Sequence, residues 1–246
     1  MTKVLAALAL TVATAAFATP PFSPILLPVY TAPTPGAYGS LWISEVMLHN
    51  PEALPMTIVV CTDECRDVTL PAGSHSDALS SYAAAAGQPP GLLIGVYLPS
   101  SLSVSLRVRD VSRSAQSFGV ELPPVNFGPG TFIYRRQLLN VPLASPFRYK
   151  LRLYDVGGGP RTAHVHVFDD DTGDDLLEAD VPLSVSRRLS YGEIDPFSFA
   201  IVSQRAGHHA RIEISAQDGG AINTMWALLT ITNNDTQEVT AVTPAQ

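Results

Sequence analysis

Two histidines in an alternating run of residues are the first candidates for chemistry in this chain. The run is Ala163-His-Val-His-Val167, so His164 and His166 are expected on one face of a strand, with apolar side chains on the other. Imidazole nitrogens at neighbouring positions of one face can share a zinc or copper ion. We therefore predict His164 and His166 as candidate metal ligands. The simpler alternative is a strand whose polar face exposes two histidines.

The densest group of charges follows directly, in Asp169-Asp-Asp-Thr-Gly-Asp-Asp175. Carboxylate oxygens are the hard ligands that Ca²⁺ prefers, which makes Asp169, Asp171 and Asp175 further candidate metal ligands and 169–175 a candidate calcium loop. The run lacks the ligand order of an EF-hand loop and its final glutamate. Aspartate and glycine are also typical of a turn between two strands, so an acidic hairpin turn is the alternative.

The chain has two cysteines, Cys61 and Cys65, separated by three residues. In an oxidising compartment such a pair forms a local disulfide. Closing so short a loop contributes about 2 kcal/mol by chain-entropy arithmetic. We predict a Cys61–Cys65 disulfide that fixes a turn. A thiolate metal site is the alternative, but a single cysteine pair gives it weak support.

No group of residues in the sequence has the spacing of a known catalytic constellation. Ser74-His-Ser-Asp77 contains the residue types of a hydrolase triad, but triad members lie far apart in sequence, and no Gly-x-Ser-x-Gly elbow accompanies them. Trp42 and Trp226 each lie in an apolar run, which predicts core positions rather than carbohydrate-stacking platforms. We therefore expect no enzymatic activity and no catalytic cofactor.

The composition excludes several classes of protein. Fifteen Lys and Arg against 22 Asp and Glu give the 246 residues a formal charge of −7, and charged residues make up only 15% of the chain. The acidic excess is shared equally between the two halves, so neither half presents the basic surface that nucleic-acid binding needs. The apolar fraction of 46% is that of a packed globular protein rather than a disordered one.

The N-terminus has the three parts of a secretory signal peptide. Lys3 supplies the charged region, an apolar run follows, and Ala16-Phe-Ala18 supplies the cleavage pattern, which predicts removal of residues 1–18. A later uncharged stretch, 78–106, is interrupted by glycine, proline and serine, so we expect no membrane span after cleavage. The predicted location is secreted or periplasmic.

Short strand-like runs recur along the chain, with turn residues between them. They cover 42–49, 56–61, 67–70, 92–98, 104–111, 117–122, 131–136, 148–155, 163–168, 176–185, 198–203, 210–215, 224–232 and 238–243, and an edge strand is expected within 25–30. One short helix is expected over 77–86. A linker at 122–130 divides the mature chain into 19–126 and 127–246, each with about seven strands. The predicted fold is all-β, with two antiparallel immunoglobulin-like β-sandwich domains in tandem.

Several longer stretches carry a resemblance to a known group of proteins. They are Pro35-Gly-Ala-Tyr-Gly-Ser-Leu-Trp42, Pro89-Pro-Gly-Leu-Leu93, Leu106-Arg-Val-Arg-Asp110, Arg148-Tyr-Lys-Leu-Arg-Leu-Tyr-Asp155, Trp226-Ala-Leu-Leu-Thr-Ile-Thr-Asn-Asn-Asp-Thr-Gln237 and Val242-Thr-Pro244. Together they resemble uncharacterised exported bacterial proteins built from paired immunoglobulin-like β-sandwich modules, over nearly the whole mature chain. The resemblance implies a sandwich fold and export, and it transfers no catalytic residues.

These observations lead to three functional hypotheses. The first is a non-enzymatic exported β-sandwich protein with a structural, adhesive or binding role, whose partner is an extracellular or cell-envelope protein or glycan. The second is a metal-binding protein or metalloenzyme centred on His164 and His166. The third is a carbohydrate-binding accessory module that uses the aromatic residues Tyr191, Phe197 and Phe199.

Overall fold

The computed structural model describes residues 22–36, 39–85, 88–97, 101–112, 119–127, 133–144, 146–159, 161–186 and 188–244. The predicted signal peptide, 1–18, lies outside the described residues. The first ten strands are β1 (Phe22–Leu27), β2 (Thr34–Pro35), β3 (Leu41–His49), β4 (Met56–Cys61), β5 (Cys65–Leu70), β6 (His75–Ser76), β7 (Leu92–Tyr97), β8 (Ser103–Asp110), β9 (Val120–Leu122) and β10 (Val125–Asn126).

Eight further strands and two short helical segments complete the described elements. The strands are β11 (Arg135–Pro142), β12 (Phe147–Asp155), β13 (Arg161–Asp169), β14 (Asp175–Ser186), β15 (Leu189–Ile194), β16 (His209–Ala216), β17 (Met225–Asn233) and β18 (Val239–Val242). The helical segments are the 3₁₀ turn η2 (Ser80–Tyr82) and α1 (Phe199–Gln204). Within the described residues no helix has the length and hydropathy to span a membrane.

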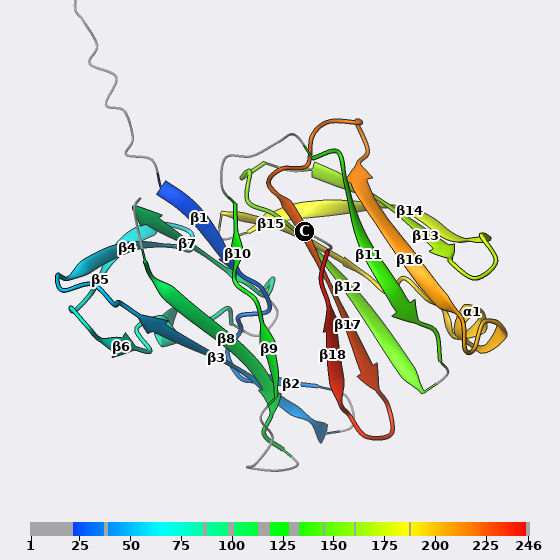
Figure 1. Cartoon of the computed structure of the whole chain (residues 1–246), viewed down its shortest axis with the longest axis horizontal. Coiled ribbons are helices and arrows are strands. Elements are labelled where there is room, and N and C mark those ends of the chain that lie inside the picture. Colours follow the sequence, from blue (N-terminus) through cyan, green and yellow to red (C-terminus); the bar gives the residue numbers. More distant parts are fainter. Residues whose placement is uncertain are drawn as a thin grey trace, which may run out of the picture.

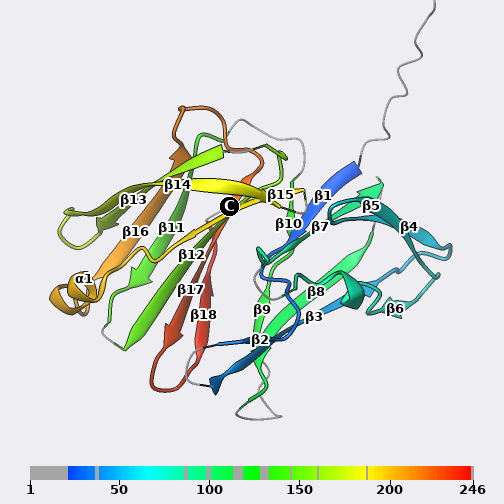
Figure 2. The same ribbon diagram turned by 180° about the vertical axis from the view of Figure 1, so that it is seen from behind.

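The strands form three sheets that divide by position in the chain (Figures 1 and 2). Strands β1–β10 form two five-stranded sheets, the N-terminal sheets, ordered β10-β1-β7-β4-β5 and β2-β3-β8-β9 with β6 beside β3. Strands β11–β18 form the C-terminal sheet, ordered β11-β16-β13-β14-β15-β12-β17-β18. All the strand pairs in these sheets are antiparallel, which confirms the all-β antiparallel part of the prediction.

Alternating burial builds the core of the C-terminal sheet. In β13, Ala163, Val165 and Val167 are buried while the histidines between them are only partly buried, and β16 alternates in the same way. Strand β14 has 12 residues and pairs first with β13 and then with β15, so it turns the sheet back over its own apolar face. The enclosed cluster includes Leu151, Leu153 and many β-branched residues of the facing strands.

A second apolar cluster joins the N-terminal sheets to the outer face of the C-terminal sheet. Leu26 and Leu106 of the N-terminal sheets belong to the same cluster as Tyr154, Trp226 and Leu228. We call this contact the seam. Gly91 lies there with φ +130°, and an added Cβ would meet Tyr154 Cε1 at 3.2 Å, so the close approach requires glycine.

Tyr154 is the largest fully buried side chain of the seam. It is 0% exposed, packs against Tyr191 and Trp226, and its Oη accepts a hydrogen bond of 3.2 Å from the backbone N–H of Val29. Burial raises the pKa of the Tyr154 phenol to about 12, so the hydroxyl is neutral at physiological pH. Val29 has φ +56°, a strained conformation for a β-branched residue, and this bond helps to hold it.

Two of the predicted secondary-structure elements are of the wrong type, and one strand was not predicted. The strand expected at 198–203 is the helix α1, because the side chain of Ser198 accepts a hydrogen bond from the backbone N–H of Ile201 and caps a helical turn. The helix expected over 77–86 is reduced to η2, which has no side-chain cap. Strand β15 was not predicted, because Gly192 interrupts its short run. The glycine is needed there, since an added Cβ would lie 2.9 Å from the carbonyl oxygen of Pro182.

The predicted disulfide is confirmed. The sulfurs of Cys61 and Cys65 lie 2.16 Å apart, and the two residues face each other in the register of β4 and β5. The disulfide therefore closes the β4–β5 hairpin at its tip, as a staple of one turn.

Truncation of Tyr154 tests the seam. We expect Tyr154→Ala to lower the free energy of unfolding by about 3–5 kcal/mol, because it opens a cavity among buried side chains. Tyr154→Phe removes only the acceptor for the Val29 N–H and is expected to cost about 1 kcal/mol. Urea denaturation of the purified protein measures both, with Tyr134→Phe, at a residue 59% exposed, as the control. If Tyr154→Ala lowers the free energy of unfolding no more than the control does, the assigned packing of the seam is wrong.

Candidate functional site

The structure places His164 and His166 on the outer face of β13, as the alternation predicted. Each imidazole contacts a carboxylate of the neighbouring strand rather than a shared centre. His164 Nδ1 lies 2.9 Å from Asp180 Oδ1 and its Nε2 lies 3.3 Å from Glu178 Oε1, while His166 Nε2 lies 2.9 Å from Asp175 Oδ1. His164 and Asp180 face each other in the β13–β14 register, and the other two contacts reach diagonally across the same pair of strands.

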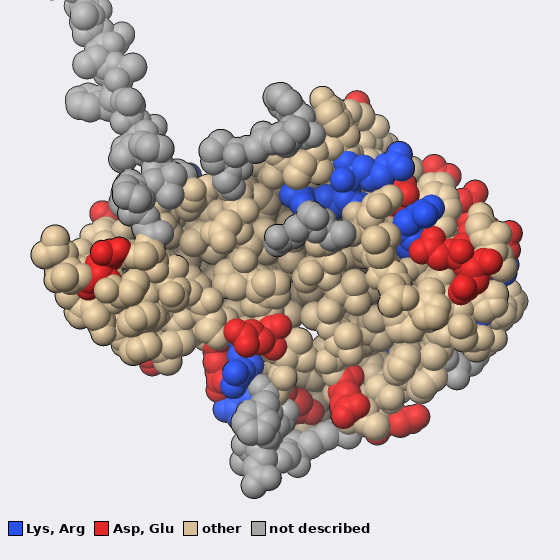
Figure 3. Space-filling model, in the orientation of Figure 1, with Lys and Arg blue, Asp and Glu red and all other residues tan. Residues whose placement is uncertain are grey.

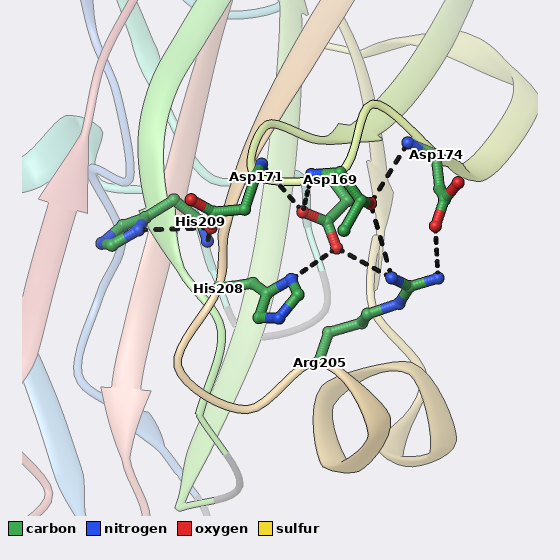
Figure 4. Close-up of polar contacts among 7 residues, drawn as sticks. Asp169, Asp171, Asp174, Arg205, His208 and His209 are labelled. Atoms are coloured by element: carbon green, nitrogen blue, oxygen red, sulfur yellow. Dashed lines mark hydrogen bonds and ion pairs between the residues drawn. The ribbon is translucent and has the colours of Figure 1, made fainter.

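Asp169 has a different environment from the two histidines. It is the last residue of β13 and is 0% exposed, whereas the other members of the acidic run are exposed. Its Oδ1 accepts hydrogen bonds from the backbone N–H groups of Asp171, at 2.9 Å, and Thr172, at 3.2 Å. Its Oδ2 lies 2.8 Å from His208 Nδ1 and 3.3 Å from a guanidinium nitrogen of Arg205 (Figure 4).

Further contacts tie the acidic turn to the loop that follows α1. Asp171 Oδ2 accepts a 2.7 Å hydrogen bond from the backbone N–H of His209, and Asp174 Oδ2 lies 2.7 Å from Arg205 (Figure 4). Together, Asp169, Asp171, Asp174, Arg205 and His208 form what we call the turn cluster. It holds the β13–β14 hairpin against the start of β16.

The five predicted metal ligands therefore do not converge. Among the described residues, the group that could share an ion is Asp169, Asp171 and His208, whose ligand atoms lie within 4.8 Å of one another. His208 was not among the predicted ligands. Both oxygens of Asp169 already accept hydrogen bonds, and the Arg205 cation beside them compensates the carboxylate charge. The observed contacts give the turn cluster a structural role.

The contacts of Asp169 also determine its protonation. Desolvation raises the pKa of the carboxyl, but the hydrogen bonds from His208 and from the backbone of Asp171 and Thr172 outweigh it, and the pKa is held below its ordinary value.

A groove of about 760 Å³ lies between the N-terminal sheets and the outer face of the C-terminal sheet, beside the seam. The N-terminal wall includes Val29, Thr31, Thr34, Trp42, Ser44 and Val108. The opposite wall includes Arg148, Lys150, Arg152, Glu193, Thr230 and Thr232. Its volume lies within the range of small-molecule sites.

Strand alternation places the basic side chains of this groove. Tyr149, Leu151 and Leu153 of β12 point into the core of the C-terminal sheet, so the residues between them point outward. The outward set is Arg148, Lys150 and Arg152, all of which line the groove. The alternating basic residues of Arg148-Tyr-Lys-Leu-Arg152 are visible in the sequence. They line a groove only because the N-terminal sheets supply its opposite wall.

The three cations differ in their partners. Lys150 Nζ lies 2.9 Å from Asp195 Oδ1 and 3.6 Å from Glu193 Oε1. Arg148 donates to the side-chain carbonyls of Asn234 and Gln237, at 2.8 and 3.0 Å. Arg152 donates to Thr230 Oγ1 at 2.8 Å, and its buried Nε has no hydrogen-bond partner among the described residues.

The two tryptophans have different positions. Trp226 is buried in the seam, as predicted, whereas Trp42 is partly exposed and lines the groove. Trp42 Nε1 donates to Ser40 Oγ at 3.0 Å. The backbone of Gly36 packs on the same edge of the ring, since an added Cβ would meet Nε1 at 2.6 Å. These contacts fix the indole in place.

Comparison with protein-family models, with curated proteins and with solved structures finds no match to this chain. The site must therefore be interpreted from its own geometry.

The aromatic residues proposed for carbohydrate binding do not form an exposed platform. Phe197 is buried, and Tyr191 packs against Tyr154 and donates a 2.6 Å hydrogen bond to Glu193. Burial also raises the pKa of the Tyr191 phenol. The side chain of Phe199 lies outside the described residues. Trp42, which the sequence assigned to a core, is the aromatic side chain that reaches the groove from the N-terminal sheets.

Basic side chains elsewhere on the surface are matched by acidic ones. On the face that Figure 3 shows, most of the Lys and Arg surface lies over β11 and β16, with Asp and Glu side chains beside it. Arg135 lies 2.7 Å from Glu213, and Arg211 lies 3.3 Å from Asp170. This group therefore presents mixed charge rather than an unbroken basic patch.

The lowered pKa of Asp169 gives a testable pH dependence. Because the pKa is lower in the folded than in the unfolded chain, the carboxylate stabilises the fold fully above pH ~4 and loses this effect as the pH falls through the folded-state pKa. We expect Asp169→Asn to cost about 1–3 kcal/mol at pH 7, since it weakens hydrogen bonds to buried groups. The difference from the native protein should shrink by pH 3.

Urea denaturation at pH 7, 5 and 3 measures this difference. Asp235→Asn, at an exposed turn position, is the control and should show little change at any of the three pH values. A cost of Asp169→Asn that does not vary with pH would contradict the assigned role of the carboxylate.

Proposed function

We propose that this chain is a non-enzymatic binding protein that holds a ligand in the groove between the N-terminal sheets and the C-terminal sheet. One observation carries the proposal. The groove has a volume of about 760 Å³, and its walls combine polar and charged side chains with apolar ones, among them Val29, Val108 and the fixed indole of Trp42. A mostly concave site with a few placed polar groups is the ordinary form of a ligand site.

The walls of the groove are held in fixed positions, which supports a role in ligand binding. The seam keeps the N-terminal sheets at a set distance from β12, and Val29 belongs both to the groove wall and to the hydrogen bond with Tyr154. A groove whose walls are held by a packed apolar contact needs little reorganisation to receive a ligand, which favours affinity.

The groups in the groove also favour binding over catalysis. Both carboxylates of the C-terminal wall, Glu193 and Asp195, contact Lys150. The acid–base pair of a hydrolase needs two carboxyl groups in different environments, whereas these two share one lysine.

The proposal also covers the cellular location of the chain and the type of its two domains. We propose that the chain is exported, as residues 1–18 predict, and that it acts outside the cytoplasm. We propose further that 19–126 and 127–246 are two immunoglobulin-like sandwiches, in agreement with the separate sets of sheets formed by β1–β10 and β11–β18.

A blocked groove tests this function. Ala85 is exposed and lines the groove, so Ala85→Trp introduces an indole at the site without disturbing a core. We expect native mass spectrometry with a panel of neutral and acidic oligosaccharides, peptides and fatty acids to find a ligand that binds the native protein. The blocked variant should bind it at least tenfold more weakly.

Ala72→Trp, at an exposed turn outside the groove, is the matched control and should bind as the native protein does. Equal thermal unfolding of the two variants would show that both are folded. The proposal would be overturned by a panel with no ligand, or by ligands that bind the blocked variant as tightly as the control.

A further inference from the structure

We propose that the ligand of the groove is an acidic oligosaccharide, with a sugar carboxylate bound by Arg152 and a sugar ring placed on Trp42. This inference rests on the proposed function and specifies the chemistry of the ligand.

The charges in the groove favour an anion. Three cations, Arg148, Lys150 and Arg152, face two carboxylates there, although the chain as a whole carries a formal charge of −7. Both carboxylates contact Lys150. The groove is therefore a locally basic site in an acidic protein, and it attracts negatively charged ligands.

Arg152 has the donors that a carboxylate needs. Its described hydrogen bond goes to the neutral Thr230 Oγ1 through one terminal nitrogen, and its buried Nε has no partner within the described part of the chain. A buried donor without a partner is costly, and a guanidinium binds a carboxylate through two parallel N–H groups. A ligand carboxylate would bind the terminal N–H groups of Arg152, which lines the groove, because the buried Nε is not accessible from there.

The rest of the lining matches a ligand with many hydroxyl groups. Thr31, Thr34 and Ser44 contribute hydroxyls from the N-terminal wall, and Thr230 and Thr232 contribute them from the other. The outward row of β12 from Arg148 to Arg152 spans about 13 Å, which exceeds a single sugar ring. The fixed indole of Trp42 offers an apolar surface for the C–H face of a ring.

The same geometry disfavours a peptide and a lipid. Strand β12 pairs with β15 on one side and β17 on the other, so its backbone has no free edge to which a peptide could add as a strand. The cations and carboxylates of the C-terminal wall would lose solvation against an acyl chain, while apolar residues such as Val29 and Val108 line the rest of the groove.

The test compares one oligosaccharide with and without its charge. Isothermal titration calorimetry of the full protein with trigalacturonic acid and with its methyl ester requires no variant. We expect the acid to bind about 10- to 100-fold more tightly than the ester, as charge-assisted hydrogen bonds would give. Arg152→Gln should remove this preference, and added salt should weaken only the acid.

Arg66→Gln is the matched control, because Arg66 is 68% exposed and its contact is a surface ion pair with Glu64. It should leave both affinities unchanged. Trp42→Leu should weaken the acid and the ester by similar factors, since it removes the ring surface and no charge.

The outcomes separate this inference from the proposed function. Equal binding of acid and ester, blocked by Ala85→Trp, would overturn the acidic ligand and leave the groove as a binding site. The same holds if neither saccharide binds while another ligand binds and is blocked. An acid whose affinity is unchanged in both Arg152→Gln and Ala85→Trp binds elsewhere, and a protein that binds nothing in the panel would overturn both.

Discussion

Burial of both faces of β12 and β17 is the constraint on which the rest of the structure depends. One face of these strands closes the core of the C-terminal sheet through Leu151, Leu153 and Leu229. The other face meets the N-terminal sheets through Tyr154 and Trp226. A strand buried on both sides contains near-continuous apolar residues, and the run Met225–Asn233 has this composition. The two sets of sheets cannot separate without exposing one of these faces.

The outer face of the same strands changes from apolar to polar along their length, and the change comes one residue pair later in β17, where the apolar Leu228 still faces Arg152. In the register of β12 and β17, Tyr154 faces Trp226, and further along Lys150 faces Thr230 and Arg148 faces Thr232. Strand β15 changes in step, since Tyr191 faces Tyr154 and Glu193 faces Arg152. The apolar part forms the seam and the polar part forms the wall of the groove. The contact that joins the sheets and the candidate site are thus two ends of a single surface.

Local patterns predicted the parts of the structure that depend on neighbouring residues. Period-two alternation predicted β13 and the outward position of His164 and His166, and the short spacing of Cys61 and Cys65 predicted the stapled hairpin. The same reasoning failed at α1, where a helix cap determines the local structure, and at β15, where a close backbone contact does so. It also assigned Trp42 to a core, because an apolar run does not reveal which of its residues reach a groove.

The candidate site depends on contacts between distant residues, which explains why the sequence did not reveal it. Arg148, Lys150 and Arg152 were recognisable as alternating charges on a strand, but their opposite wall comes from the N-terminal sheets, in part from residues such as Val29 and Trp42 more than 100 positions earlier. Likewise, His208 reaches Asp169 from 39 residues away, and no local pattern connects the two. Register and sheet packing, rather than composition, bring these groups together.

The hydrogen bond between Val29 and Tyr154 spans 125 residues of the chain. Loop closure over such a separation costs entropy before any contact repays it, so contacts of this kind form late in folding. One wall of the groove comes from each end of that span, and a chain with only one half folded has no groove. For the proposed binding function, this means that retention of a ligand would distinguish a completely folded molecule from one with only one half folded.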